Sequence, residues 1–160
     1  MMNKQKVGTG PIDKIIWELP LKTISESNSS EHWTKSSKRH RQQQFFIRCL
    51  FNKEAQEIPM PCEITLIRIS SKFLDAEENL PMAFKWIKDE IGACLFPEKV
   101  VTFHKKNGKI VKNKGHADSD PRVKWKYAQE KGKIAGIRIE IRSLGEYDLV
   151  DVEPLHIAHG

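Results

Sequence analysis

The segment from Asn79 to Cys94 has the most regular apolar pattern in the chain. Apolar side chains recur there every three or four residues, which places them on one face of a helix. The residues on this face are Leu80, Ala83, Phe84, Ile87, Ile91 and Cys94. Asn79 is a favourable N-cap residue, and Pro81 is tolerated in the first turn because an N–H at that position would have no helical partner. The pattern predicts an amphipathic helix that begins at Asn79 and buries this face.

A second helix is predicted from Glu31 to Phe51. Its second half carries apolar residues at three- and four-residue spacing, namely Phe45, Phe46, Cys49 and Leu50. Its first half is strongly basic instead. We therefore expect a helix that is apolar at one end and basic at the other.

Five segments have the composition or the alternation of strands: 15–21, 62–69, 100–103, 123–127 and 136–141. In the last of them Ile137, Ile139 and Ile141 are expected to point inward. Residues 105–116 are predicted to form a loop or a hairpin. The order of strands and helices predicts an α+β fold, with a mixed β-sheet packed with two main helices.

Length and composition favour one compact domain. The chain has 160 residues, of which 39% are hydrophobic and 30% charged, enough to bury a single core. We expect a flexible lead over residues 1–13, a domain over 14–144 and a C-terminal appendage over 145–160. No apolar stretch approaches the roughly 18–20 residues needed to cross a bilayer, and no secretory signal is evident. We therefore expect a cytoplasmic protein with no membrane partner.

The three cysteines do not have the spacing of a metal site. Cys49, Cys62 and Cys94 are far apart and lie in apolar runs, whereas zinc ligands usually come in close pairs. Buried reduced thiols are the favoured interpretation.

Two acidic clusters lie at the ends of predicted elements. Asp75, Glu77 and Glu78 precede the Asn79 helix, and Asp118 and Asp120 precede the strand at 123–127. If both clusters meet in space, three or four carboxylates suit a Mg²⁺ site that polarises a phosphodiester. The alternative is that the first cluster only favours the positive end of the helix dipole and the second is an ordinary turn.

The acidic motifs resemble those of a known enzyme family. LDAEENL at 74–80 and DSDPRV at 118–123 are similar to the two acidic motifs of the RusA-type Holliday-junction resolvases. Weaker similarity extends over residues 15–142. The resemblance implies a RusA-like fold and an endodeoxyribonuclease that hydrolyses phosphodiester bonds in branched DNA, with Mg²⁺ as the cofactor and Mn²⁺ as a substitute.

Carried over by position, the resemblance also implies roles for individual residues. Metal ligands would come from Asp75, Glu77, Glu78 and Asp120, with Asp118 as a further catalytic candidate. The position of the family's helix lysine is occupied by Met82, and Lys85 follows one turn later. Lys85 is expected to stabilise charge that develops on the phosphate. The alternative is a solvent-facing Lys85 paired with Asp89.

Basic residues gather in two stretches of the chain. The 27 Lys and Arg residues outnumber the 21 Asp and Glu residues, for a net charge of +6. The candidate nucleic-acid contacts are Lys35, Lys38, Arg39 and Arg41 in the first stretch, and Lys105, Lys106 and Lys109 in the second. Two basic patches around an acidic centre suit a branched DNA, whose phosphates run in several tracks. The alternative is that both stretches only confer solubility.

These features lead to one main hypothesis and one rival. The main hypothesis is a metal-dependent, structure-specific endonuclease for four-way junctions. Two symmetric nicks across a junction require two active sites, so a homodimer is expected. The rival is a catalytically inactive nucleic-acid-binding module that retains the same fold. A third hypothesis is an interaction subunit that uses the tail after Gly145.

Overall fold

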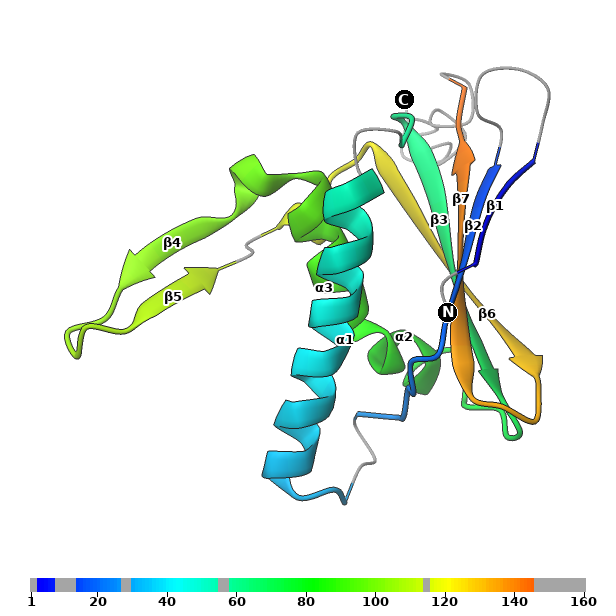
Figure 1. Cartoon of the computed structure of the whole chain (residues 1–160), viewed down its shortest axis with the longest axis horizontal. Coiled ribbons are helices and arrows are strands. Elements are labelled where there is room, and N and C mark those ends of the chain that lie inside the picture. The colour runs from blue at the N-terminus through cyan, green and yellow to red at the C-terminus, as the bar shows by residue number, and fades with distance from the viewer. Residues whose placement is uncertain (1–2, 8–13, 27–29, 55–57, 114–115, 146–160) are drawn as a thin grey trace, which may run out of the picture. The chain divides into compact units, whose positions relative to one another are not determined.

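The computed structural model of the chain has an α+β fold (Figure 1). It describes residues 3–7, 14–26, 30–54, 58–113 and 116–145, and only the backbone of 3–7 and 53–54. Contacts divide the chain into two compact units. We call them the sheet unit, formed by Met1–Lys22, Ile58–Phe73 and Pro121–Gly160, and the helical unit, formed by Thr23–Glu57 and Leu74–Asp120. Within the described ranges, no helix has both the length and the apolar character that crossing a membrane requires.

The sheet unit is a five-stranded mixed sheet (Figure 1). A mixed sheet is expected from the sequence, but the predicted strand at 100–103 is not part of it and belongs to a separate two-stranded hairpin. Its strands are β1 (Asn3–Val7), β2 (Lys14–Leu19), β3 (Cys62–Ser70), β6 (Val123–Lys131) and β7 (Gly136–Ser143). Their order across the sheet is β1-β2-β7-β3-β6. Strands β3 and β6 run parallel, and the other neighbours are antiparallel.

One face of this sheet is apolar and buried. Trp17 of β2 lies opposite Ile139 of β7, which lies opposite Leu66 of β3. All three side chains are fully buried, and Ile137 and Ile141 are buried on the same strand, as expected. Burial also raises the pKa of the Cys62 thiol to about 12, because the thiolate is poorly solvated there.

The opposite face carries charged side chains that pair across strands. Glu63 accepts from Arg142 at 3.3 Å and lies 3.2 Å from Lys126 Nζ. Burial alone would raise the pKa of Glu63, but these two cations outweigh it and lower the pKa. Glu140 lies 2.6 Å from Lys14 Nζ. The charges on this face are thus largely neutralised within the sheet.

The ends of the chain differ in part from the sequence-based expectation. Asn3–Val7 form strand β1 and pair with β2, where a loose lead is predicted. Residues 8–13 lie outside the described part of the chain, as does the predicted appendage after Gly145. The boundaries of the predicted 14–144 domain stay a prediction.

The helical unit contains three helices among its described residues. They are α1 (Trp33–Glu54), α2 (Asn79–Ala83) and α3 (Lys85–Leu95), and α1 packs beside α3 (Figure 1). The predicted apolar face is buried from Leu80 to Ile91, whereas its last predicted member, Cys94, is a free thiol that is only half-buried. The helix is interrupted at Phe84, however, and the N-cap residue is Glu78. Asn79 instead accepts a hydrogen bond from the Ser25 hydroxyl at 2.7 Å.

The buried face of α1 differs from the predicted one. Ile47, Leu50 and Phe51 are buried, whereas Phe45 is 59% exposed. Cys49 is an exposed free thiol, so the expectation that it is buried is wrong. The buried residues of α1 follow three- and four-residue spacing from Gln43, so the buried face of the helix includes Gln43 and does not include Phe45.

A two-stranded hairpin completes the helical unit. Strand β4 (Val101–His104) pairs antiparallel with β5 (Ile110–Asn113). Gly108 occupies the turn with φ of 81°, a left-handed conformation that favours glycine. Two short 3₁₀ helices flank the hairpin in sequence, η2 (Pro97–Lys99) and η3 (Ala117–Ser119).

Candidate functional site

The first acidic motif forms the turn that starts α2. Asp75 Oδ1 accepts hydrogen bonds from the backbone N–H groups of Glu77 at 2.7 Å and Glu78 at 3.2 Å. All three carboxylates are exposed. Asp75 therefore has a local structural role, because its side chain satisfies two N–H donors that precede the helix.

The second acidic motif is fixed against α3 by a glycine. A Cβ atom at Gly92 would lie 2.6 Å from Asp118 N and 2.9 Å from Ala117 C. The backbone of η3 thus lies directly on α3, and only glycine fits at this contact. On the same helix, Lys88 Nζ lies 3.9 Å from Asp118 Oδ2.

Asp120 is a buried carboxylate with a close cation. Its side chain is only 4% exposed, and Lys99 Nζ lies 2.6 Å from its Oδ2. Removing a carboxylate from water costs several kcal/mol unless a partner compensates, and Lys99 supplies this compensation. Asp120 is therefore a buried acidic side chain at the end of η3 with a cation beside it.

The described residues do not form the four-carboxylate cluster that the resemblance implies. Among the residues that the structure describes, no group of three or more His, Cys, Asp or Glu side chains could hold a metal ion. Asp75 is engaged by its own turn and Asp120 by Lys99. The grouping of Asp75, Glu77 and Glu78 with Asp120 that the resemblance implies is thus not seen in this conformation.

Two lysines beside the second acidic motif are not among the site residues predicted from the sequence. Lys85 is exposed, and its Nζ lies 5.3 Å from the ring centroid of Trp86. Lys88 lies within ion-pair distance of Asp118, and Lys99 within ion-pair distance of Asp120. Gly92, one turn after Lys88, is a sequence signal for this contact, because a glycine inside a helix costs about 1 kcal/mol relative to alanine and can be placed there for packing.

The basic first half of α1 is only partly exposed. Lys35, Lys38 and Arg41 are exposed to solvent. Arg39 is not, because its side chain is 10% exposed and forms ion pairs with both Glu26 and Glu31. Arg39 therefore belongs to an internal network and not to the solvent-facing basic surface.

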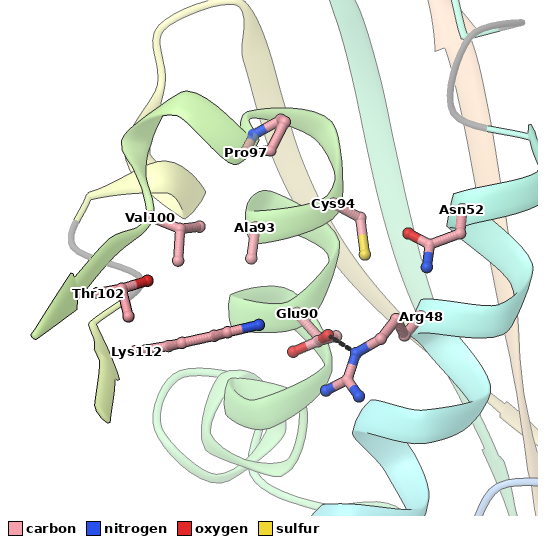
Figure 2. A pocket seen from close by; sticks show the side chains of 9 residues that line it. All are labelled: Arg48, Asn52, Glu90, Ala93, Cys94, Pro97, Val100, Thr102 and Lys112. Atoms are coloured by element: carbon pink, nitrogen blue, oxygen red, sulfur yellow. Dashed lines mark hydrogen bonds and ion pairs between the residues drawn. The ribbon is translucent and has the colours of Figure 1, made fainter. Parts of the chain in front are cut away.

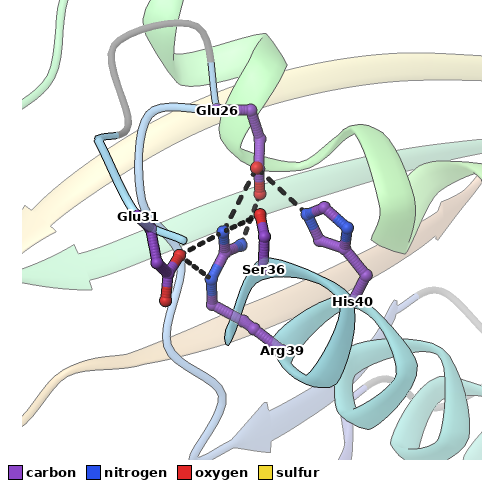
Figure 3. A network of polar contacts seen from close by, with 5 residues as sticks. All are labelled: Glu26, Glu31, Ser36, Arg39 and His40. Carbon is purple, nitrogen blue, oxygen red and sulfur yellow. Dashed lines mark hydrogen bonds and ion pairs between the residues drawn. The ribbon is translucent and has the colours of Figure 1, made fainter. Parts of the chain in front are cut away.

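The Arg39 network connects three segments of the helical unit (Figure 3). Besides Arg39, Glu26 contacts His40 Nε2 at 3.0 Å. Burial alone would raise the pKa of Glu26, but Arg39 and His40 outweigh it and lower the pKa. The His40 ring stacks on Trp86 with centroids 4.4 Å apart. The network thus links the segment before α1 to α1 and to α3.

A polar cavity of about 510 Å³ lies between α1, α3 and the hairpin (Figure 2). Its lining includes Glu90, whose side chain is 4% exposed and which accepts from Arg48 Nε at 2.9 Å. Lys112 of β5 points into the cavity toward Glu90 (Figure 2). No sequence pattern linked these residues, because they come from three elements distant in sequence.

The basic residues of the second stretch lie on the hairpin. Lys105, Lys106 and Lys109 are all exposed around the turn, and Lys112 follows on β5. Exposed lysines at a hairpin tip can reach phosphates without displacing any protein contact.

Comparisons with known proteins do not assign this chain to a group. No protein-family model, no curated protein and no solved structure matches the chain. The function of the chain is therefore inferred from the arrangement of its own residues.

Proposed function

We propose that the chain is a metal-dependent, structure-specific endodeoxyribonuclease with a RusA-like fold that cleaves four-way or related branched DNA. It would act in the cytoplasm as a homodimer, so that two active sites nick the junction symmetrically. The helical unit contains the acidic residues of both motifs and the basic residues of both stretches.

The observation that carries the proposal is the buried carboxylate of Asp120. The resemblance implies a catalytic role for this residue, and the described structure supports the role independently. Buried carboxylates are uncommon because of their desolvation cost, and they occur often at functional sites. Asp118, fixed by the Gly92 contact, lies two residues away.

Mg²⁺ is the proposed cofactor, with Mn²⁺ as a substitute. Such an ion would supply positive charge to the scissile phosphate. Because the two acidic motifs do not group in the described conformation, the proposal requires them to come together when metal and DNA bind.

The first experiment compares two substitutions that break the same ion pair. Asp120→Asn removes the carboxylate, whereas Lys99→Met removes the cation and keeps the carboxylate. Cleavage of a synthetic four-way junction is expected to fall by about 100-fold or more in Asp120→Asn, and to persist in Lys99→Met. Equal activity in the two variants would show that Asp120 has only a structural role.

The second experiment separates the charge of Asp75 from its turn. Asp75→Asn keeps an oxygen that can accept the N–H groups of Glu77 and Glu78, but removes the charge. Asp75→Ala removes both. We expect Asp75→Asn to melt like the wild type and to lose junction cleavage. Full cleavage by Asp75→Asn would show that the charge of Asp75 is not needed for the metal site.

The second candidate function is a nucleic-acid-binding module without catalysis. It is favoured by the 2.6 Å contact between Lys99 and Asp120, in which a lysine already neutralises the carboxylate. This candidate predicts that the wild type binds a junction but leaves it intact in both Mg²⁺ and Mn²⁺.

A further inference from the structure

The β4–β5 hairpin is a two-stranded ribbon with a solvent-exposed surface. Figure 1 shows it projecting from the helices of its unit. Every described residue from Val101 to Ile110 is exposed. No third strand pairs with it among the described residues. A two-stranded hairpin is marginally stable in water, so a ribbon of this kind gains from a partner.

The charge of the ribbon points to a polyanion. Between Val101 and Asn113 the sequence contains four lysines and no acidic residue. Lys112 points toward Glu90, and the other three, Lys105, Lys106 and Lys109, are exposed around the turn (Figure 2). Lys105 and Lys109 are joined across the hairpin by a 2.8 Å backbone hydrogen bond, so two like charges face each other. Such a pair is unfavourable in isolation and is relieved when phosphates lie near it. The same charges oppose contact with the ribbon of a second copy.

Apolar side chains are exposed on both faces of the ribbon. Val101 is 57% exposed and Phe103 43% exposed on one face, and Ile110 is 63% exposed on the other. Cations alone would suffice for contact with phosphates. Apolar side chains add contacts to base edges, and the thymine methyl group is an apolar target in the major groove.

The dimensions of the ribbon suit a duplex groove. Two paired strands lie about 4.8 Å apart, and four residues of β4 extend about 13 Å. The major groove of B-DNA is about 12 Å wide and admits a two-stranded ribbon, whereas the minor groove is about 6 Å wide. We infer that the β4–β5 hairpin enters the major groove of a duplex arm, with Lys105 and Lys109 on the flanking phosphates. This inference rests on the proposed function, because that function supplies DNA as the partner.

The first test measures the salt dependence of duplex binding. Lys105→Gln/Lys109→Gln is compared with the wild type and with Lys72→Gln/Lys133→Gln, which removes two exposed lysines of the sheet unit. The slope of log K against log salt is expected to become shallower by about 1.8 in the ribbon variant, or about 0.9 per phosphate contact. The slope of the control variant should equal that of the wild type. Equal slopes in the two variants would overturn the inference.

The second test identifies the groove. One duplex carries glucosylated 5-hydroxymethylcytosine, which fills the major groove, and another is saturated with netropsin, which fills the minor groove. Wild-type affinity is expected to fall about tenfold or more on the glucosylated duplex, as for the loss of a good base contact, and to change little with netropsin. The ribbon variant should respond less to glucosylation. Loss of binding with netropsin alone would overturn the inference.

The outcomes separate this inference from the proposed function. If the wild-type chain binds neither duplex nor junction DNA, both the groove inference and the proposed function are wrong. If the wild-type chain cleaves junctions and the ribbon variant binds duplex DNA as well as the wild type does, only the groove inference is wrong.

Discussion

Gly92 is the residue on which the position of the second acidic motif depends. In Gly92→Ala the new Cβ would meet the backbone of Ala117 and Asp118 at less than 3.0 Å. Because backbone cannot move aside cheaply, we expect a loss of about 1–3 kcal/mol in the free energy of unfolding, measured by urea denaturation. Gln42→Ala, at an exposed position of α1, is the control and should change stability by less than about 0.5 kcal/mol. Equal stability of the two variants would contradict the close contact between η3 and α3.

The carboxylate of Glu26 should make stability depend on pH. Its folded pKa is lowered from 4.5, so the stabilisation is present above pH 4.5 and is lost as the pH falls through the lower folded pKa. Glu26→Gln should therefore lower the free energy of unfolding at pH 7, by about 1.5–3 kcal/mol for charged hydrogen bonds. It should also flatten the loss of stability below pH 4.5. Denaturant unfolding at several pH values is the measurement.

A matched substitution tests this assignment. Glu31→Gln leaves Arg39 paired with Glu26, so its effect at pH 7 should be smaller than that of Glu26→Gln. An equal loss of stability in both variants would mean that Glu26 and Glu31 contribute alike to the Arg39 network.

At the scale of the element, two phenylalanines of α1 should behave differently. Phe51 is fully buried, whereas Phe45 is 59% exposed. Phe51→Ala should lower the free energy of unfolding by about 3–5 kcal/mol, because it leaves a cavity. Phe45→Ala should change it by less than about 0.5 kcal/mol. If Phe51→Ala does not fold, Phe51→Leu gives a smaller loss to compare with Phe45→Leu. A larger effect at Phe45 would restore the helix face predicted from the sequence.

The elements that could be predicted have periodic burial of their own. The helix face from Leu80 to Ile91 and the alternation of Ile137, Ile139 and Ile141 both follow from local spacing. Strand β1 could not be predicted, because NKQKV at 3–7 has no apolar alternation and forms a strand through its pairing with β2. The face of α1 was misassigned because an exposed Phe45 is indistinguishable from a core residue in the sequence.

The same limit applies to the candidate site. The resemblance singled out Asp120, but its partner Lys99 is brought to it only by the tertiary structure. Arg39 was placed among the DNA contacts because the sequence does not show that Glu26 lies beside it. Spacing along a chain therefore identifies residue types suited to a chemistry, and packing decides which of them face solvent.

At the scale of the whole molecule, charge is distributed differently in the two units. The charged face of the sheet pairs many of its charges, as Glu63 does with Lys126 and Arg142. Both units have exposed lysines, but the exposed carboxylates at the start of α2 and the exposed lysines of the hairpin and of α1 all belong to the helical unit. The proposed DNA contacts and the proposed catalysis therefore both belong to the helical unit.

Metal binding provides the test that bears on the whole chain. An ion held by the native state alone stabilises it by RT ln(1 + [L]/Kd), about 2.7 kcal/mol at a concentration of 100 Kd. For a chain of this size, that corresponds to a rise of about 5–11 °C in Tm. The nuclease proposal predicts such a rise in millimolar Mg²⁺ or Mn²⁺ with junction DNA present, relative to NaCl of equal ionic strength. Asp75→Asn combined with Asp120→Asn should abolish the rise. If Mg²⁺ and Mn²⁺ leave the wild-type Tm unchanged while the chain still binds the junction, the chain is a binding module. The buried Asp120 then has only a structural role, as the partner of Lys99.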